Sequence, residues 1–500
     1  MTGVRTRTAA GLLAALIFAP AARPDDPDPI QVLRAFEQAA AQATARAERC
    51  VVSIGRLAAA PQLPPLGVFG QRPSANQPDW RELFGAGVLL KPPGRDRERL
   101  VLTNRHVVID RSASRSGAPR QGLIVVLPDR IQVPAEVIAA DPRSDLAVLR
   151  MDLSNSGVRV DELPTLEFGA AEEFQKGQFA LLLGNPYAVA RDGSASVSLA
   201  TIANISRAPW NGLNRPQVDQ DLTVHHLGTL WHLDSRIQLG GSGGAVVDFE
   251  GRLIGLTTSL AAIEGYESSV GYAVPMTRGM RRVVDSLLEG YEVEYGFLGI
   301  APRSFGRFGG FAAPLRGPAR GAEIDSVALG SPADVAELRS GDVVNAVNGS
   351  PIRTEDDLIR EIGLLGPDGV AVLDINRAGA RGGASQVEVR LGKWPVYDDT
   401  AIIATRMRTP AWRGLNIDFP TARRRYITTN LFERYPQAVV VTSVVAGSPA
   451  AAAGLQEGLF VASVNGEPVQ TPAEFAAAIT RVAGAARLQL DDGREFTVGE

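Results

Sequence analysis

The sequence predicts a multidomain protein: an all-β barrel or sandwich domain followed by two copies of a small α+β module. At 500 residues the chain is long for one domain, and its 45% hydrophobic and 21% charged residues are typical of globular proteins. Short apolar runs separated by turns fill residues 50–275, a spacing typical of barrels and sandwiches. Further along, a set of motifs recurs at a constant separation, which indicates a duplicated module.

The first residues predict an export signal, assigned to residues 1–22. Arg5 and Arg7 precede an apolar stretch at 9–18, and Ala19-Pro-Ala21 offers small residues for cleavage. The apolar stretch is too short to span a bilayer comfortably. We therefore expect a soluble protein exported to the periplasm or cell envelope, with an uncleaved amino-terminal anchor as the alternative. Residues 23–48 form an amino-terminal segment in which helical spacing predicts a helix.

Residues 49–290 are assigned to the β domain, which ends in a helix at 277–289. Ten apolar runs are its expected strands: 51–54, 87–90, 100–102, 123–127, 133–138, 146–149, 179–183, 245–247, 253–257 and 270–274. Cys50, the single cysteine, excludes an intrachain disulfide framework. Because it lies in an apolar run, we expect a buried, unreactive thiol.

The duplicated module is recognised by motifs that recur 117 residues apart. Gly330-Ser-Pro-Ala333 returns as Gly447-Ser-Pro-Ala450, and Val347-Asn-Gly349 returns as Val464-Asn-Gly466. In the first copy, Ser331 and Thr354 are predicted helix N-caps. The two copies are assigned to residues 291–395 and 396–500.

The stretch Gly240-Gly-Ser-Gly-Gly244 raises the question of function. Glycine and serine runs are often flexible linkers, but β-prone apolar residues follow this one directly. Glycines on both sides of one serine indicate a backbone that approaches another group closely. Ser242 is therefore a candidate nucleophile, and a serine hydroxyl needs a neighbouring base at neutral pH.

All four histidines of the chain precede Ser242. This order excludes the nucleophile elbow of the α/β-hydrolases, in which the histidine follows the serine. His106 comes after a β-type run and is the candidate general base. Asp145 opens an apolar strand and is the candidate carboxylate that orients His106, whereas Asp141 is assigned to a turn before Pro142. The order His–Asp–Ser is that of the chymotrypsin-type barrel.

Other function classes find little support. His225, His226 and His232 lack the spacing of known metal motifs, and the adjacent pair would point apart on a strand or loop edge. We expect no metal and no cofactor. A net charge of −4 and a pI near 5.8 give no sign of nucleic-acid binding.

Five motifs in order resemble blocks of the HtrA/Deg family of trypsin-like serine proteases, and they lie at residues 102–108, 144–149, 183–186, 240–244 and 270–275. The duplicated modules resemble that family's two PDZ domains. This resemblance implies a double β-barrel protease with His106 as base, Asp145 as orienter and Ser242 as nucleophile. It also implies ATP-independent cleavage of unfolded or misfolded proteins by a homotrimer or larger homo-oligomer in the cell envelope.

The family pattern also assigns an oxyanion hole to the backbone N–H groups of Gly240 and Ser242. Gln238-Leu239 stands where the family has Asn-Pro. Arg236 stands where the family usually has a small residue near the specificity pocket. If its guanidinium entered that pocket, it would favour acidic side chains; the alternative is an outward-facing arginine.

The PDZ resemblance implies that chain ends bind at a loop of converging N–H groups. In the first copy this loop is assigned to Leu298, Gly299 and Ile300. In the second copy the same spacing places Asn416 at the position of the loop glycine, which would weaken binding there.

These observations predict an exported serine endopeptidase whose PDZ domains bind peptide carboxyl termini, with unfolded proteins or peptides as substrates. A non-catalytic or latent PDZ scaffold or holdase is the alternative. The intact His–Asp–Ser set favours the enzyme.

Overall fold

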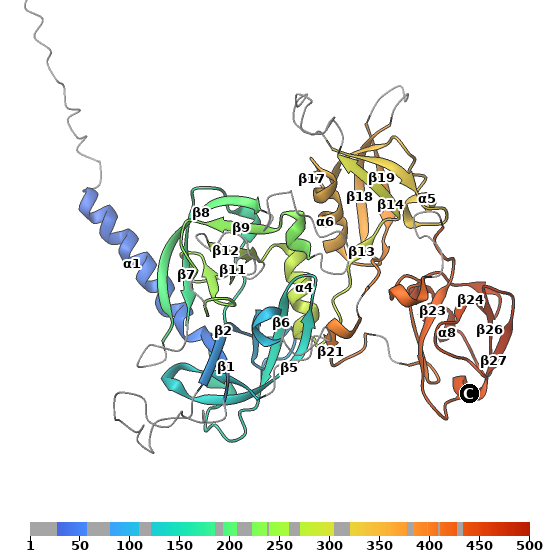
Figure 1. Cartoon of the computed structure of the whole chain (residues 1–500), viewed down its shortest axis with the longest axis horizontal. Helices are drawn as coiled ribbons and strands as arrows, with labels where there is room; N and C mark the ends of the chain where they lie inside the picture. The colour runs from blue at the N-terminus through green and yellow to red at the C-terminus, as the bar shows by residue number, and fades with distance from the viewer. Residues whose placement is uncertain are drawn as a thin grey trace, which may run out of the picture.

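The computed structural model describes residues 28–57, 81–109, 122–185, 194–207, 223–237, 240–259, 271–304, 321–377, 384–397, 399–408, 411–427 and 434–500. The predicted export signal lies outside these ranges. Two β-barrels, a first small domain and a second small domain follow one another along the chain (Figure 1).

The first barrel closes through six strands in the order β5-β4-β1-β2-β3-β6, with β6 pairing back to β5. These strands are β1 (Val51–Leu57), β2 (Arg81–Leu90), β3 (Leu100–Asn104), β4 (Leu123–Val126), β5 (Gln132–Asp141) and β6 (Leu146–Met151). A short helix, α2 (Arg105–Val108), follows β3 directly. All six strands were predicted from their apolar runs.

The second barrel closes in the order β10-β11-β12-β9-β8-β7. Its strands are β7 (Phe179–Gly184), β8 (Ser196–Arg207), β9 (Leu230–Leu233), β10 (Ala245–Val247), β11 (Leu253–Thr258) and β12 (Gly271–Pro275). The ten predicted runs include neither β9 nor β8, and β8 is the longest strand of this barrel. Its apolar residues Val197 and Leu199 are 47% and 46% exposed, whereas small Ala200 faces the core, so the strand has no apolar run.

Two helices flank the barrels. Helix α1 (Pro29–Ala47) packs on the second barrel through Phe36, whose ring lies 5.6 Å from Phe179 and 5.2 Å from Phe249. Helix α4 (Arg278–Leu288) begins at the N-cap Thr277, as predicted, and buries Val283 and Leu287 against the common core. Cys50 is buried in the same core. Burial raises the pKa of its thiol to about 12, which keeps it protonated and unreactive.

The two small domains share one topology, a five-stranded sheet with a short strand beside it. The first contains β13 (Gly296–Phe297), β14 (Ile300–Ser304), β15 (Ala322–Val327), α5 (Pro332–Val335), β16 (Val343–Val347), β17 (Ser350–Pro351), α6 (Glu355–Leu365), β18 (Val370–Asn376), β19 (Ala384–Arg390) and β20 (Gly392–Lys393). The second contains β22 (Leu415–Asp418), β23 (Val439–Val444), α7 (Pro449–Ala452), β24 (Phe460–Val464), β25 (Glu467–Pro468), α8 (Pro472–Thr480), β26 (Ala486–Leu490) and β27 (Glu495–Val498). Ser331 and Thr354 cap α5 and α6, as predicted.

The structure corrects the expected alignment of the two copies at one loop. Val327, which pairs with Ile300, corresponds to Val444, which pairs with Leu415. Gly414 therefore stands where the first copy has Gly299, and the expectation that Asn416 takes this place is wrong. The second copy has two additional residues between the loop and its Ser-Pro-Ala motif, since Gly299 and Ser331 are 32 residues apart and Gly414 and Ser448 are 34 apart.

Segments between the small domains also contact the first barrel. Strand β21 (Ile403–Ala404) pairs antiparallel with the end of β5 and so adds a seventh strand to that sheet (Figure 1). The sequence analysis placed these residues in the second small domain. The two small domains also contact each other. The backbone N–H of Tyr435 donates to the Leu329 carbonyl at 2.9 Å, and the Tyr435 ring stacks on Phe297.

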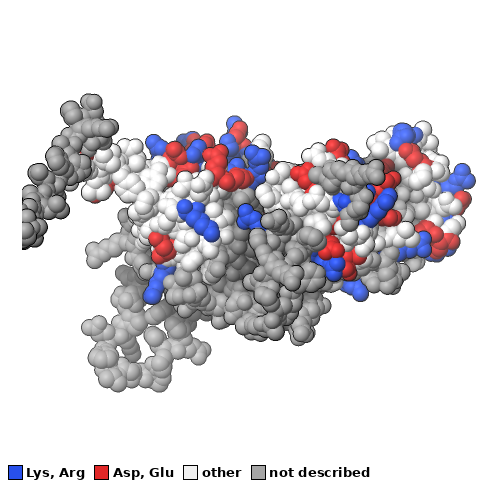
Figure 2. Space-filling model, turned by 90° about the horizontal axis from the view of Figure 1, so that it is seen from above, with Lys and Arg blue, Asp and Glu red and all other residues white. Residues whose placement is uncertain are grey.

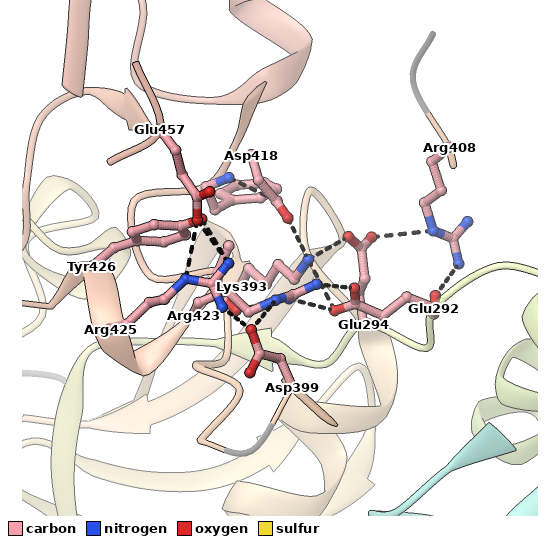
Figure 3. A network of polar contacts seen from close by, with 12 residues as sticks. Glu292, Glu294, Lys393, Asp399, Arg408, Asp418, Arg423, Arg425, Tyr426 and Glu457 are labelled. Carbon is pink, nitrogen blue, oxygen red and sulfur yellow. Dashed lines mark hydrogen bonds and ion pairs between the residues drawn. The ribbon is translucent and has the colours of Figure 1, made fainter. Parts of the chain in front are cut away.

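A buried cluster of charges joins the first small domain, the second small domain and the segment after α4 (Figure 3). Lys393 of β20 is only 1% exposed, and its Nζ lies 2.7 Å from Asp418, 2.8 Å from Glu294 and 3.2 Å from Glu292. Arg423 makes a two-pronged contact with Glu292 at 2.6 and 2.9 Å. Burial opposes ionisation of Lys393, but the three carboxylates raise its pKa above the ordinary value.

Lys393→Met is expected to destabilise the docking of the second small domain by about 3–5 kcal/mol, because it leaves buried carboxylates without their cation. Asp418 loses its ion-pair partner, and burial already raises its pKa. The variant should therefore recover stability as the pH falls and Asp418 takes up a proton. Hydrogen exchange of residues 415–418 measures this, with the exposed Lys176→Met as the control. Unchanged protection in both variants would contradict the prediction.

On the face shown in Figure 2, acidic and basic side chains of the described residues are interspersed rather than gathered into one patch. None of the helices in the described ranges has the length and apolar character needed to cross a membrane.

Candidate active site

The fold brings His106 and Asp145 together through two neighbouring strands. Strand β3 pairs with β6 so that Asn104, the last residue of β3, lies opposite Leu146, the first of β6. His106 follows β3 on helix α2, and Asp145 directly precedes β6. His106 Nδ1 lies 2.5 Å from Asp145 Oδ2, and the backbone N–H of His106 donates to Asp145 Oδ1 at 3.0 Å. One carboxylate oxygen therefore holds the imidazole and the other holds the backbone of His106.

Asp145 has a backbone φ of 53°, in the left-handed region that a non-glycine residue seldom adopts. Such conformations concentrate at functional sites, where the surrounding structure holds them. Here the Asp145 carbonyl accepts the Arg105 N–H at 2.7 Å. Burial alone would raise the pKa of Asp145, but the charge of His106 and its hydrogen bonds hold it below the ordinary value.

Ser242 lies in the loop before β10, at the seam between the two barrels. Its carbonyl accepts the N–H of Ala86 from β2 of the first barrel at 2.7 Å. Gly243 has a φ of 87°, and a Cβ there would overlap the Ala86 carbonyl oxygen. A Cβ on Gly244 would lie 2.5 Å from the Leu183 carbonyl oxygen. Gly243 therefore permits a close approach between the barrels and Gly244 permits one within the second barrel, in agreement with the close approach expected from the glycines around Ser242.

The hydroxyl of Ser242 makes no hydrogen bond with His106 Nε2 in this structure. Its Oγ lies 2.6 Å from Ser259 Oγ and accepts the Ser259 N–H at 3.0 Å. His106 Nε2 is buried and has no hydrogen-bond partner in the described part of the chain. The Ser242 hydroxyl is therefore turned toward Ser259, the residue directly after β11. Apo structures of enzymes often show long or absent catalytic hydrogen bonds.

The turn that carries Asp145 is held by Asp141 and by His225, and the sequence did not predict the role of His225. Asp141 is the expected turn residue, since its Oδ2 accepts the Ser144 N–H at 2.8 Å and the Ser144 hydroxyl at 2.6 Å. His225 Nε2 donates to the Ser144 carbonyl at 2.8 Å, and its Nδ1 lies 2.6 Å from the Thr229 hydroxyl. His225 and His226 lie in a short 3₁₀ helix at Val224–Leu227 and are both buried, which corrects the expected strand or loop edge.

Burial lowers the pKa of His225 to about 4, from 6.5. Between pH 6.5 and pH 4, His225 therefore binds a proton in the unfolded chain but stays neutral in the folded chain. The free energy of unfolding falls as the pH falls through this range. The lost stabilisation at pH 4 is about 3 kcal/mol. We expect His225→Gln to remove this loss, because an amide can still donate to Ser144 and does not titrate.

Urea unfolding at pH 7 and pH 4 measures the effect of His225→Gln. The partly exposed His232→Gln is the matched control. A pH dependence that is equally steep in His225→Gln and in the wild type would refute the assignment of this stability term to His225.

Family models match three parts of the chain. The model of the trypsin-like peptidase domain matches residues 85–256, and the PDZ domain model matches residues 323–377 and 440–490. The chain is a serine endopeptidase with a trypsin-like peptidase domain and two PDZ domains, and it is similar to the HtrA/Deg family. Its two barrels form the trypsin-like protease domain, and the two small domains are PDZ1 and PDZ2.

Curated relatives are similar to this serine endopeptidase over most of its length. A "Probable periplasmic serine endoprotease DegP-like" of Chlamydia pneumoniae is 27% identical over 404 residues, covering 81% of this chain and 72% of the relative. A protein of the same name from Hahella chejuensis is 28% identical over 410 residues, covering 81% and 77%. A solved structure titled "HtrA-type protease AlgW with decapeptide" is 25% identical, covers 71% of this chain and 99% of that chain, and has a TM-score of 0.46.

The predicted chain-end loop of PDZ1 has its carbonyls turned toward helix α5. The Leu298 carbonyl accepts from Ala333 N–H and the Gly299 carbonyl from Ala328 N–H, both at 2.9 Å. In a trans peptide the next N–H points the opposite way, so the N–H groups of Gly299 and Ile300 face away from α5. Gly299 has a φ of 83°, and a Cβ there would overlap Ser331.

PDZ2 repeats this backbone geometry. The carbonyls of Arg413 and Gly414 accept from Ala450 and Val445 at 3.1 and 2.8 Å, and Gly414 has a φ of 82°. The N–H groups of Gly414 and Leu415 therefore face away from α7, but the Leu415 N–H donates to the Trp412 carbonyl at 2.8 Å.

The remaining predictions near the nucleophile have different outcomes. Arg236 is exposed, which agrees with the outward-facing alternative, and Gln238 and Leu239 lie outside the described residues. Gly240 has a φ of 85°; its N–H and that of Ser242 stay predicted oxyanion donors. Within the described ranges, no group of three or more His, Cys, Asp or Glu residues is placed to hold a metal ion.

Proposed function

We propose that this protein is an exported, ATP-independent serine endopeptidase of the HtrA/Deg type that cleaves unfolded or misfolded proteins by a His106–Asp145–Ser242 triad. The observation that carries the proposal is the buried pair of Asp145 and His106. Asp145 Oδ2 lies 2.5 Å from His106 Nδ1, and His106 Nε2 has no hydrogen-bond partner in the described structure. A buried imidazole held by a carboxylate on one nitrogen is prepared to accept a proton on the other.

The reaction begins when Ser242 Oγ turns from Ser259 toward His106. His106 Nε2 takes the hydroxyl proton as Oγ bonds to the carbonyl carbon of the scissile peptide. Asp145 holds the Nδ1 proton and stabilises the imidazolium. His106 then gives the proton to the leaving amine, and the acyl group stays on Ser242. In the second half of the reaction, His106 takes a proton from the water that attacks the acyl carbon and returns it to Ser242 Oγ as the carboxylic acid product leaves.

The developing oxyanion needs donors that are already in place. We assign these to the N–H groups of Gly240 and Ser242, because Gly240 has the positive φ that lets this backbone turn toward the nucleophile. One such donor is worth about 3 kcal/mol of transition-state stabilisation.

PDZ1 binds peptide carboxyl termini at Leu298, Gly299 and Ile300 and thereby regulates cleavage. The N–H groups of Gly299 and Ile300, which both face away from α5, support the assignment. The name of the relatives supports a periplasmic or envelope location, and the family resemblance supports a homotrimer or larger assembly. The domain limits proposed from the sequence are residues 49–290, 291–395 and 396–500.

Covalent labelling tests the proposal directly. The full mature chain is incubated with a reduced, unfolded protein, with and without prior treatment by a fluorophosphonate, and without ATP. We expect fragments only from the untreated enzyme, and mass spectrometry should find the phosphonyl group on Ser242. A label on another serine would disprove the assignment of the nucleophile.

The latent scaffold or holdase remains the second candidate, because Ser242 faces Ser259 rather than His106. If neither fragments nor label formed, even with a free-ended peptide present, this alternative would replace the enzyme.

A further inference from the structure

The turn that carries Asp145 is gripped from the PDZ1 side. Tyr295 lies between helix α4 and β13, and its hydroxyl donates to Asp141 Oδ2 at 2.6 Å. The same oxygen accepts the N–H and the hydroxyl of Ser144, the residue directly before Asp145. Asp141 Oδ2 therefore links Ser144, the neighbour of Asp145, to Tyr295, which lies outside the strands of the two barrels.

A second contact grips the same turn. The Arg143 guanidinium lies over the rings of Tyr295 and Trp394, 5.2 and 5.5 Å from their centroids, and donates to the Pro395 carbonyl. The backbone N–H of Trp394 in turn donates to the Tyr295 carbonyl at 2.7 Å. Tyr295 and Trp394 therefore form one unit that holds the turn from 141 to 145.

This unit continues directly into the chain-end loop. Tyr295 precedes β13 and Trp394 follows β20, and these two short strands pair with each other. Beyond β13 come Leu298 and Gly299, two residues of the proposed carboxylate loop. Only two residues, Gly296 and Phe297, separate Tyr295 from that loop.

The hydrogen bond of Tyr295 is well placed to transmit a displacement. The residue is buried, and burial together with the Asp141 carboxylate raises the pKa of its hydroxyl well above the ordinary value. The hydroxyl therefore keeps the proton that it donates. A cavity lined by Arg143, Tyr295, Trp394 and residues of helix α6 lies beside the contact, so the packing around it leaves room for movement.

We propose that Tyr295 is a positioning residue that couples the chain-end loop of PDZ1 to the carboxylate of Asp145 through Asp141 and Ser144. The proposal rests on the proposed function of Asp145 and of the PDZ1 loop. A peptide at Leu298–Ile300 shifts the β13–β20 pair, Tyr295 moves with it, and the turn carries the Asp145–His106 pair, already joined at 2.5 Å, toward Ser242.

Tyr295→Phe tests the coupling in the full chain, because it removes only the hydroxyl. The control is Tyr291→Phe, on the same segment, whose ring contacts Arg406 and Arg408. The probe is a decapeptide ending in a free valine carboxylate, compared with the same peptide as its carboxyl-terminal amide. We measure kcat and KM for a fluorogenic substrate, and the Kd of the decapeptide by fluorescence anisotropy.

We expect Tyr295→Phe to bind the free-ended decapeptide with the wild-type Kd but to lose its activation. The kcat should fall about tenfold, the size of one hydrogen bond to a charged acceptor, with KM unchanged. Asp141→Asn should have a similar effect, and the double variant should be no worse than either single one. Activation of Tyr295→Phe equal to that of the wild type would overturn the proposal.

A second readout separates this proposal from the proposed function. The proton on His106 Nδ1, in its short bond to Asp145, should give a far-downfield NMR signal that the decapeptide shifts in the wild type and in Tyr291→Phe. We expect no shift in Tyr295→Phe. A wild-type shift without proteolysis would keep the coupling and reject the enzyme; proteolysis with an identical shift in all three proteins would reject the coupling alone.

Discussion

Ser242→Ala is expected to lower kcat for cleavage of an unfolded protein by about 10⁶-fold, the loss found when the nucleophile of a serine protease triad is removed. Alanine keeps the backbone N–H and the carbonyl that accepts from Ala86, so the loop should keep its shape. The loss therefore measures the Oγ alone. Single-turnover cleavage with excess enzyme is the measurement, since it detects slow residual hydrolysis.

Ser259→Ala is the matched control for Ser242→Ala. It removes the other hydroxyl of the 2.6 Å pair but leaves the proposed nucleophile, so cleavage should persist. Because the resting Ser242 would lose one of its two hydrogen bonds, the basal rate should equal or exceed that of the wild type. Activity in Ser242→Ala together with its loss in Ser259→Ala would assign the reaction to Ser259 instead.

The sequence predicted the parts of the fold that depend on uniform patterns. Apolar runs predicted six strands of the first barrel; β3, β4 and β6 are buried on both sides, whereas β5 is partly exposed over its first half. Strand β8 has no such run, since it exposes Val197 and Leu199 and buries Ala200. Composition alone does not tell whether an apolar residue lies at the surface or in the core.

The candidate site was predictable as far as it depends on local motifs. His106, Asp145 and Ser242 each stand out by their flanking residues, and the pairing of β3 with β6 brings the first two together. Tyr295 and Ser259 carry no motif, because their importance comes from contacts that tertiary structure creates. The loop of PDZ2 was misaligned for a related reason: the two additional residues lie outside the motifs that set the register of the repeat.

Asp145→Asn is expected to lower kcat by about 10⁴-fold by imposing the wrong tautomer on His106. In the wild type, both carboxylate oxygens accept from His106, one from the backbone N–H and one from Nδ1. An amide has only one accepting oxygen. The backbone N–H is a permanent donor, so the amide oxygen faces it and the NH₂ group faces Nδ1. Nδ1 must then accept, and the proton resides on Nε2.

A proton on Nε2 prevents His106 from accepting the proton of Ser242, although every atom of the base is in place. The rate of fluorophosphonate labelling of Ser242 should therefore fall along with kcat, whereas KM should change little. Asp161→Asn, on an exposed carboxylate, is the control and should leave both rates unchanged. A loss of less than tenfold in Asp145→Asn would mean that Asp145 does not set the tautomer, and the short contact at 2.5 Å would then be structural.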